Sequence, residues 1–216
     1  MNKTFLRSTL LAVAAFLLST TSSASTIKLT DVNHALPRSG VYAGLYTLNI
    51  DGQNVLAMCD DFNTSIYIGL QWTAVPYDYS QIVAGAPVKF ASGGISKYSE
   101  IGYLFSLVPT STASQQADIN LAVWRIMTPT AALSLTGNAL TYFNTATGGT
   151  YNTFDYTNYM RVWTPNPLNA SQEFLGASPT VVPPSSVPLP SGLWLFVSGL
   201  AGMVGSLRRK GLTRSV

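Results

Sequence analysis

The chain has 216 residues, of which 47% are hydrophobic and only 10% are charged, and its formal net charge is +3. The basic excess lies near the two ends, whereas residues 25–207 carry six basic and nine acidic residues and a net charge of −3, which excludes a nucleic-acid-binding surface there. With one cysteine, Cys59, and one histidine, His34, an intramolecular disulfide and a Cys-based zinc cluster are excluded, and a Ser-His-Asp triad is poorly supplied.

The N-terminal segment has the three parts of a secretory signal peptide. Lys3 and Arg7 precede an apolar run at residues 10–18, and the sequence then becomes small and polar. The apolar run is too short to span a bilayer. We therefore expect residues 1–24 to direct export, with cleavage between Ala24 and Ser25.

A strand-rich half is expected next. Two β-rich runs, residues 42–50 and 53–62, flank Asp51 and Gly52. This dipeptide suits the positive φ angles of a type I′ turn, so the pattern predicts a β-hairpin. Aromatic and branched residues in 66–79 predict another strand.

Helices are expected after this half. Apolar spacing predicts one helix over 95–108 and a second that Ser114 caps and that ends before Pro129. A third is expected over 136–144, followed by a returning strand within 154–163.

These elements predict one exported domain over residues 25–178. Its expected fold class is α+β, with a strand-rich N-terminal half of hairpins packed with two or three helices. A C-terminal transmembrane helix is expected outside this domain, as described below.

Cys59, in the segment AMCDDF, is the most reactive side chain expected in the domain, and an inert buried thiol is the alternative. Asp60 and Asp61 follow it directly. Neighbours on a strand point to opposite faces, so these two carboxylates do not predict an acid–base dyad. Their charge also disfavours a thiolate. We therefore predict a protein that is not an enzyme, with no catalytic residue, cofactor or metal site.

The C-terminal region changes composition. Residues 179–186 are rich in Pro and Ser and predict an extended spacer. The 19 residues from 189 to 207 carry no charge, and a helix of that length spans about 28 Å, close to the hydrocarbon thickness of a membrane. A buried core helix is the alternative. The basic residues that follow predict a stop-transfer signal, with a cytoplasmic tail at 211–216; they are Arg208, Arg209 and Lys210.

A four-residue motif precedes this apolar segment, and it consists of Val187, Pro188, Leu189 and Pro190. With the apolar helix and the Arg-rich end, residues 187–210 resemble the PEP-CTERM/VPLPA-CTERM class of sorting signals. Leu189 stands where the commoner motif has Glu, and Ser191 stands where the VPLPA form has Ala.

The resemblance implies an exosortase-like membrane enzyme as partner, which reads the motif and cuts near it. The membrane span at 189–207 would then be transient, and the precursor would become a cell-surface or extracellular protein of a Gram-negative-type envelope. The resemblance also implies a link to extracellular polysaccharide or biofilm. A permanent membrane anchor remains the alternative fate of the tail.

The hairpin ending in MCDDF and the later INLAVW segment are loosely similar to the thioester domains of bacterial surface adhesins. In those domains a strand cysteine is joined to the Gln of a TQxAIW-type helix, and Cys59 would match that cysteine. Asn120 stands where Gln is expected and is shorter by about 1.5 Å, the length of one carbon–carbon bond. Gln116, one turn earlier on the same helical face, is the alternative acyl donor.

Two functions therefore remain open. The leading prediction is a non-enzymatic, exported surface or extracellular matrix protein that its C-terminal signal sorts. The alternative is a covalent adhesin-like domain with a Cys59 thioester.

Overall fold

A computed structural model describes residues 23–38 and 40–178. The predicted spacer, sorting motif, transmembrane helix, stop-transfer residues and tail, and nearly all of the predicted signal peptide, lie outside the described residues. None of the helices within these residues combines the length and the apolar character that a membrane span requires.

The described elements are seven strands, three longer helices (α3, α4 and α5), a short helix α2 and two 3₁₀ turns. In chain order they are β1 (Ser25–Asp31), β2 (Ala35–Arg38), β3 (Val41–Ile50), β4 (Gln53–Cys59), β5 (Gln71–Tyr77), α2 (Tyr79–Val83), η2 (Ala91–Gly93), α3 (Ile95–Ser106), η3 (Val108–Thr110), α4 (Ala113–Met127), α5 (Gly137–Thr147), β6 (Met160–Pro165) and β7 (Phe174–Ala177).

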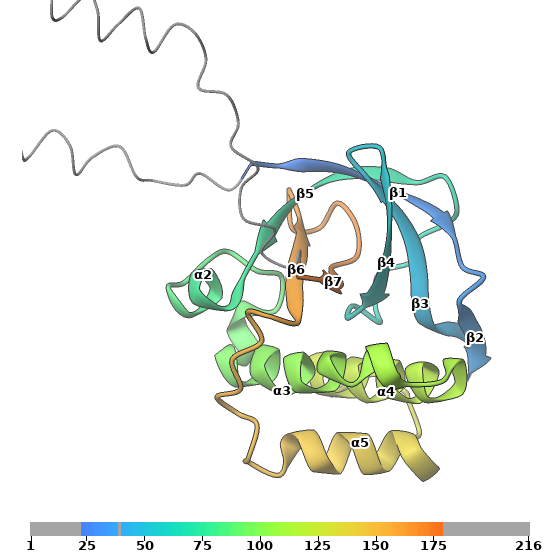
Figure 1. Ribbon diagram of the computed structural model, residues 1–216, viewed down its shortest axis with the longest axis vertical. Coiled ribbons are helices and arrows are strands. Elements are labelled where there is room, and N and C mark those ends of the chain that lie inside the picture. Colours follow the sequence, from blue (N-terminus) through green and yellow to red (C-terminus); the bar gives the residue numbers. More distant parts are fainter. Residues whose placement is uncertain (1–22, 39, 179–216) are drawn as a thin grey trace, which may run out of the picture. The chain divides into compact units, whose positions relative to one another are not determined.

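Six antiparallel strands close into a barrel in the order β1-β5-β6-β7-β4-β3 (Figure 1). The barrel closes because the long strand β3 pairs with β4 on one side and with β1 on the other. Residues 47–50 of β3 pair with β1, whereas residues 41–44 pair with β2. One ten-residue strand therefore both closes the barrel and carries the additional strand β2.

The predicted β3–β4 hairpin is confirmed. Ile50 pairs with Gln53, which leaves Asp51 and Gly52 as a two-residue loop. Their φ angles are 49° and 91°, as a type I′ turn requires. The turn therefore fixes the register that places Cys59 at the end of β4.

Side chains at alternate positions of a strand point into two different hydrophobic cores, one inside the barrel and one between the barrel and the helices. On β4, Ala57 and Cys59 belong to the barrel core, whereas Met58 between them belongs to the core shared with the helices. The largest members of the barrel core are Ile27, Leu29, Tyr46, Leu48, Ile50, Trp72, Leu121, Trp124, Leu133 and Phe174. Both sides of β4 are thus buried at its C-terminal end.

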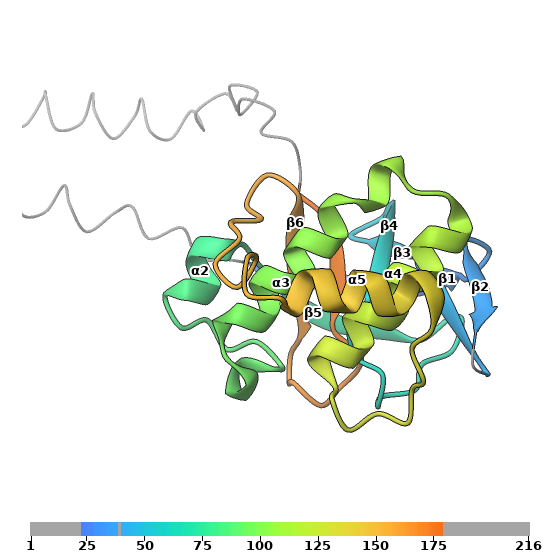
Figure 2. The ribbon, with the colours of Figure 1, turned by 90° about the horizontal axis from the view of Figure 1, so that it is seen from below.

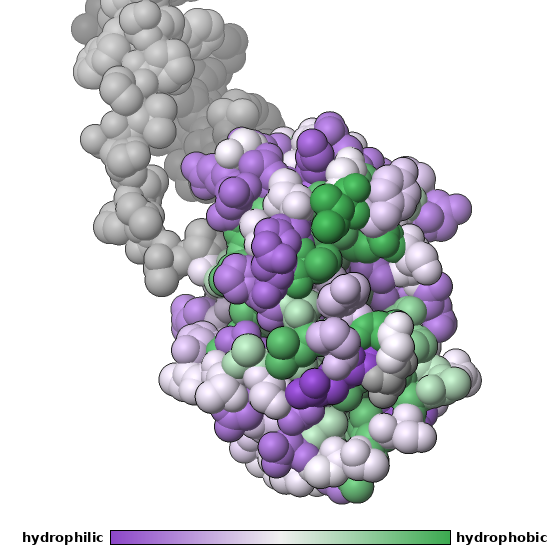
Figure 3. Space-filling model, turned by 90° about the vertical axis from the view of Figure 1, so that its right-hand side faces the viewer, coloured by the Kyte–Doolittle hydropathy of each residue, from purple (hydrophilic) through white to green (hydrophobic). Residues whose placement is uncertain are grey.

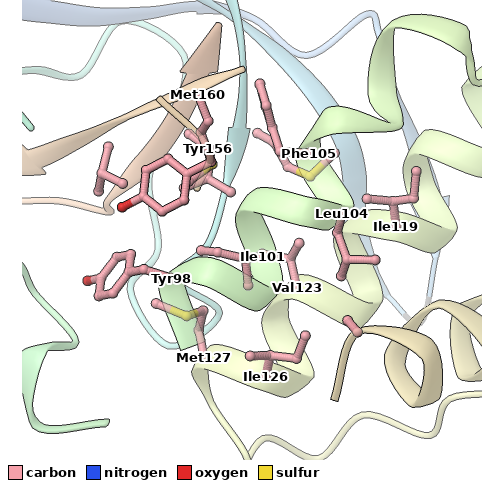
Figure 4. Packing of buried hydrophobic residues seen from close by; sticks show 14 of the residues in the cluster. Tyr98, Ile101, Leu104, Phe105, Ile119, Val123, Ile126, Met127, Tyr156 and Met160 are labelled. Atoms are coloured by element: carbon pink, nitrogen blue, oxygen red, sulfur yellow. The ribbon is translucent and has the colours of Figure 1, made fainter. Parts of the chain in front are cut away.

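Helices α3, α4 and α5 cover one end of the barrel (Figures 1 and 2). Helix α4 packs against β3, and α5 packs against the side of α3 and α4 that faces away from the barrel. Side chains of α3, such as Ile101 and Leu104, meet Val123 and Ile126 of α4 in the helix-side core (Figure 4). Gly102 permits close packing here, because a Cβ on it would lie 2.5 Å from Cδ1 of Tyr156.

The end of α4 lies where the sequence predicts it, but its first residues differ from the prediction. Thr112, and not Ser114, is the N-cap, and it forms a capping box with Gln115. The helix ends at Met127, before Pro129, as predicted.

The α+β prediction is confirmed for the described domain, and β6, which begins at Met160, is the returning strand that residues 154–163 predict. Strands β6 and β7 follow the helices and complete the barrel between β5 and β4. Short strands that are buried on both sides lack the alternating pattern of a half-exposed strand, and in β7 three of four residues are buried. The sequence pattern therefore did not predict β7, nor did it predict β1, β2 and α2.

Candidate functional site

The candidate site lies where the end of β4 meets α4. Strand β4 ends at Cys59, and Asp60 and Asp61 continue the chain; the exposed fractions of these three residues are 0%, 0% and 1%. Asn120 and Trp124 of α4 are one helical turn apart and are both buried. The register of the hairpin and the position of α4 bring these residues together.

The Cys59 thiol is enclosed by its own chain. Its Sγ donates a hydrogen bond to the carbonyl oxygen of Asp61 at 3.1 Å and accepts one from the Asp61 N–H at 3.3 Å. Burial raises the pKa of the Cys59 thiol well above its usual value, and the neighbouring carboxyl groups of Asp60 and Asp61 add to this rise. The nearby Trp124 indole lowers this pKa, but by less than burial raises it. Its Nε1 makes no hydrogen bond of standard geometry among the described residues. The thiol is therefore protonated at neutral pH and is a poor nucleophile.

Asn120 bonds to backbone groups on two strands. Its Nδ2 donates to the carbonyl oxygen of Cys59 at 2.7 Å, and its Oδ1 accepts from the N–H of Gly44 at 2.8 Å. Gly44 has a φ of +125°, and a Cβ there would lie 3.3 Å from the carbonyl oxygen of His34. Asn120 therefore joins β3, β4 and α4 through a fully buried amide. We call these three residues, Gly44, Cys59 and Asn120, the amide corner.

Gln116 points elsewhere. Its Nε2 donates to the carbonyl oxygens of Val108 and Ser111 at 3.2 and 3.1 Å, which holds η3 against the start of α4. Of the two predicted acyl donors, the structure thus brings Asn120 to Cys59 and leaves Gln116 bonded to another segment. Within the described chain, neither side-chain amide is hydrogen-bonded to Sγ of Cys59, so the thioester stays a prediction.

Asp60 contacts Glu173, which directly precedes β7. Glu173 is fully buried and accepts hydrogen bonds from the Tyr98 hydroxyl at 2.7 Å, the Thr164 hydroxyl at 2.5 Å and the Lys89 N–H at 3.0 Å. Burial, and then the negative charge of Glu173, raise the pKa of Asp60 well above its usual value. Two ionised carboxylates here would repel each other, so Asp60 keeps its proton beside Glu173, and its N–H donates to the Glu173 carbonyl oxygen at 3.3 Å.

Asp61 contacts Lys89. Its Oδ2 lies 2.5 Å from Nζ of Lys89, and the side chains are only 2% and 16% exposed. Nζ also donates to Oγ1 of Thr64 at 3.0 Å and to the carbonyl oxygen of Ser171 at 2.7 Å. The second oxygen of Asp61, Oδ1, accepts the N–H groups of Asn63 and Thr64 at 3.0 and 3.2 Å. We call Asp60, Asp61, Lys89 and Glu173 the charged cluster.

Sequence reasoning missed Lys89 and Glu173. Asp60 and Asp61 do not form a dyad with each other, as expected, but each pairs with a residue far along the chain. Glu173 adjoins a strand that the sequence pattern did not reveal, and Lys89 lies in a loop. No spacing rule would have linked these positions to β4. Within the described ranges, no group of three or more His, Cys, Asp and Glu residues is placed to hold a metal ion.

A pocket of about 350 Å³ opens beside the buried thiol. Trp124 and Phe62, whose ring centroids are 5.5 Å apart at a steep angle, form part of its wall. The pocket combines aromatic and aliphatic side chains with a few polar groups, and its lining residues include Tyr42, Tyr46, Tyr67, Asp61, Thr64 and Gln172. The face of the molecule that carries β2 and β3 mixes apolar patches with polar residues (Figure 3).

Comparisons with known proteins give one distant structural likeness. No protein-family model matches the chain, and a comparison with curated proteins finds no similar sequence. Among solved structures, the domain is similar to the N-terminal thioester domain of a surface protein from Clostridium perfringens, with a TM-score of 0.47 and 11% sequence identity. The match covers 71% of this chain and 98% of that one. A likeness this distant carries no conclusion about function.

Proposed function

We propose that the chain is an exported, non-enzymatic protein of the cell surface or extracellular matrix, sorted by its C-terminal signal, whose domain binds extracellular polysaccharide non-covalently in the pocket beside Cys59. The observation that carries the binding role is the composition of this pocket. Its aromatic rings suit stacking on the apolar faces of sugar rings, and its amide and hydroxyl groups suit the sugar hydroxyls.

Exposure of the aromatic residues supports this role. Tyr42 and Tyr67 line the pocket and are 53% and 69% exposed as residues, so their rings are open to a ligand. Thr64 and Gln172 are held by bonds within the protein, which fixes their positions before a ligand arrives. Such preorganisation lowers the entropic cost of binding.

The sorting role rests on the sequence between Val187 and Lys210 and on the signal peptide. C-terminal sequencing of the protein recovered from its producing cells tests it. A mature chain that ends near Pro190 supports processing by an exosortase-like enzyme. Recovery of residues 208–216 still attached would instead establish a permanent anchor.

The binding role is tested with polysaccharide purified from the extracellular matrix of the producing cells. We expect Tyr67→Ala to weaken binding in a titration by about tenfold, or about 1.4 kcal/mol, because it removes a stacking surface. Tyr159→Ala is the matched control, since Tyr159 is 47% exposed but does not line the pocket. Equal binding by the two variants, or no binding by the unaltered protein, contradicts this role.

Covalent adhesion through a Cys59 thioester is the second candidate function. The observation that favours it is the 2.7 Å contact that brings the Asn120 amide to the Cys59 backbone. To form the thioester, Asn120 would have to give up both of its hydrogen bonds in the amide corner. A domain mass lower by one ammonia, which rises by the mass of one methylamine on treatment with methylamine, would support the thioester. An unmodified mass with a thiol that titrates after unfolding would exclude it.

A further inference from the structure

Lys89 and Asp61 form a buried contact that the proposed binding role does not require. The amine Nζ lies 2.5 Å from Oδ2 of Asp61, and both side chains are largely withdrawn from water. Burial of an ion pair is costly, because both groups lose their hydration. The two side chains are therefore placed as an amine and a carboxyl group that can react with each other.

The two oxygens of the Asp61 carboxyl group have different surroundings. Oδ1 accepts two backbone N–H groups, from Asn63 and Thr64, an arrangement that stabilises negative charge on a carbonyl oxygen during acyl transfer. Oδ2 pairs with Nζ of Lys89 and has no other polar partner among the described residues. Oδ1 is thus placed as the oxyanion and Oδ2 as the leaving group.

The Lys89 amine is also oriented. The carbonyl oxygen of Ser171 and Oγ1 of Thr64 accept hydrogen bonds from Nζ at 2.7 and 3.0 Å and hold it against Asp61. A nucleophile held beside its target reacts as if it were present at a very high concentration. Positioning of this kind is what a condensation without an external enzyme requires.

We propose that Lys89 and Asp61 condense to an intramolecular isopeptide bond. Proton transfer from Nζ to Oδ2 gives a neutral amine and a carboxylic acid, and the amine lone pair then attacks Cγ of Asp61. The Cγ–Oδ2 bond breaks, and Oδ2 leaves as water with the transferred proton and a second proton from Nζ. One ammonium and one carboxylate thus become one amide and one water, with no oxidant or co-reactant.

The surroundings suit this product. Asp61 and Thr64 line the pocket, which gives the water a route to solvent. The bond would join the end of β4 to the loop before α3, across 28 positions of the chain. A crosslink of this kind stabilises a fold mainly by restricting the unfolded chain.

Tryptic mapping of the full chain tests the bond. An acylated lysine is not cleaved by trypsin, so Lys89 would survive digestion and residues 39–97 would appear as one peptide, lighter by one water. Fragment ions should place the link between Asp61 and Lys89. Loss of water alone is not sufficient, because Asp51 and Gly52 in the same peptide can close to a succinimide, which leaves cleavage at Lys89 intact.

A variant and a control sharpen this result. Lys89→Arg keeps the positive charge but cannot form the amide, so cleavage after position 89 should return and the water-loss signature should disappear. Lys97→Arg should keep the linked peptide, because Nζ of Lys97 bonds to the Met127 carbonyl and not to a carboxylate. Complete cleavage at Lys89 in the unaltered protein, with residues 39–89 and 90–97 at unmodified mass, would overturn the proposal whatever the variants do.

Discussion

The amide corner and the charged cluster meet at the end of β4, where Cys59 belongs to the first and the next two residues, Asp60 and Asp61, belong to the second. The two sets place their buried polar groups in different surroundings. In the amide corner, neutral Asn120 bonds to two backbone groups, on Gly44 and Cys59. In the charged cluster, Lys89 pairs with Asp61, and Asp60 retains a proton beside Glu173. A neutral amide is insensitive to pH, whereas paired carboxyl groups respond to it.

The difference indicates a division of roles. The amide corner fixes the positions of β3, β4 and α4, and its contribution should be the same under all mild conditions. The charged cluster ties β4 to the loop at Lys89 and to Glu173, and its contribution should depend on protonation and on the presence of every partner. Four substitutions separate these roles, in order of decreasing expected effect.

Lys89→Met should have the largest effect. It leaves the Asp61 carboxylate buried without a partner and also removes the proposed isopeptide bond, and loss of one partner of a buried pair alone costs about 3–5 kcal/mol in the free energy of unfolding. Urea unfolding measures the change. Lys28→Met, at an exposed position, is the matched control and should change stability by no more than about 0.5 kcal/mol. Equal stabilities of the two variants would contradict a stabilising Lys89–Asp61 pair.

Asn120→Leu should have the next largest effect. A side chain of similar size fills the space but leaves the Gly44 N–H and the Cys59 carbonyl unpaired, which should cost about 2–4 kcal/mol. The measurement is again urea unfolding, at two pH values. The loss should be equal at both, because no titrating group is removed; a strongly pH-dependent loss would mean that the amide corner and the charged cluster are coupled.

Asp60→Asn should change the pH dependence of stability. The pKa of Asp60 is raised in the folded state, so its stabilising effect is complete below the unfolded pKa and is lost as pH rises through the folded pKa. The unaltered protein should therefore lose about 1–3 kcal/mol over this rise. The variant cannot titrate at this position, and the difference between the two unfolding curves should grow toward alkaline pH. Parallel curves would show that Asp60 is ionised in the folded protein.

Gln116→Ala should have the smallest effect. Gln116 is only half-buried, and water can replace its bonds to the Val108 and Ser111 carbonyls, so we expect a loss of about 0.5–1.5 kcal/mol. Thermal unfolding measures it. A loss as large as that of Asn120→Leu would mean that the two α4 amides contribute equally to the free energy of unfolding. That result would contradict the expectation that the fully buried amide of Asn120 contributes more than the half-buried amide of Gln116.

Local rules predicted the parts of the fold that depend on local chemistry. The Asp51-Gly52 turn and the end of α4 before Pro129 each follow from backbone preferences of a few residues. Barrel closure does not, because β3 meets β1 and β7 meets β4 through pairings between distant segments. The proximity of Cys59 and Asn120 was expected from resemblance, but which groups of Asn120 make the contact was not.

The sequence by itself determined the hairpin, the three longer helices and the single thiol, because turns, caps and periodic apolar residues act over short distances along the chain. It also carries the predicted export and sorting signals at the two ends. Only the tertiary structure decided that Asp60 meets Glu173, that Asp61 meets Lys89, and that the Cys59 thiol is enclosed with a raised pKa. These outcomes depend on burial and on contacts between residues far apart in the chain. Both arise only when the strands close into a barrel and α4 packs against its end.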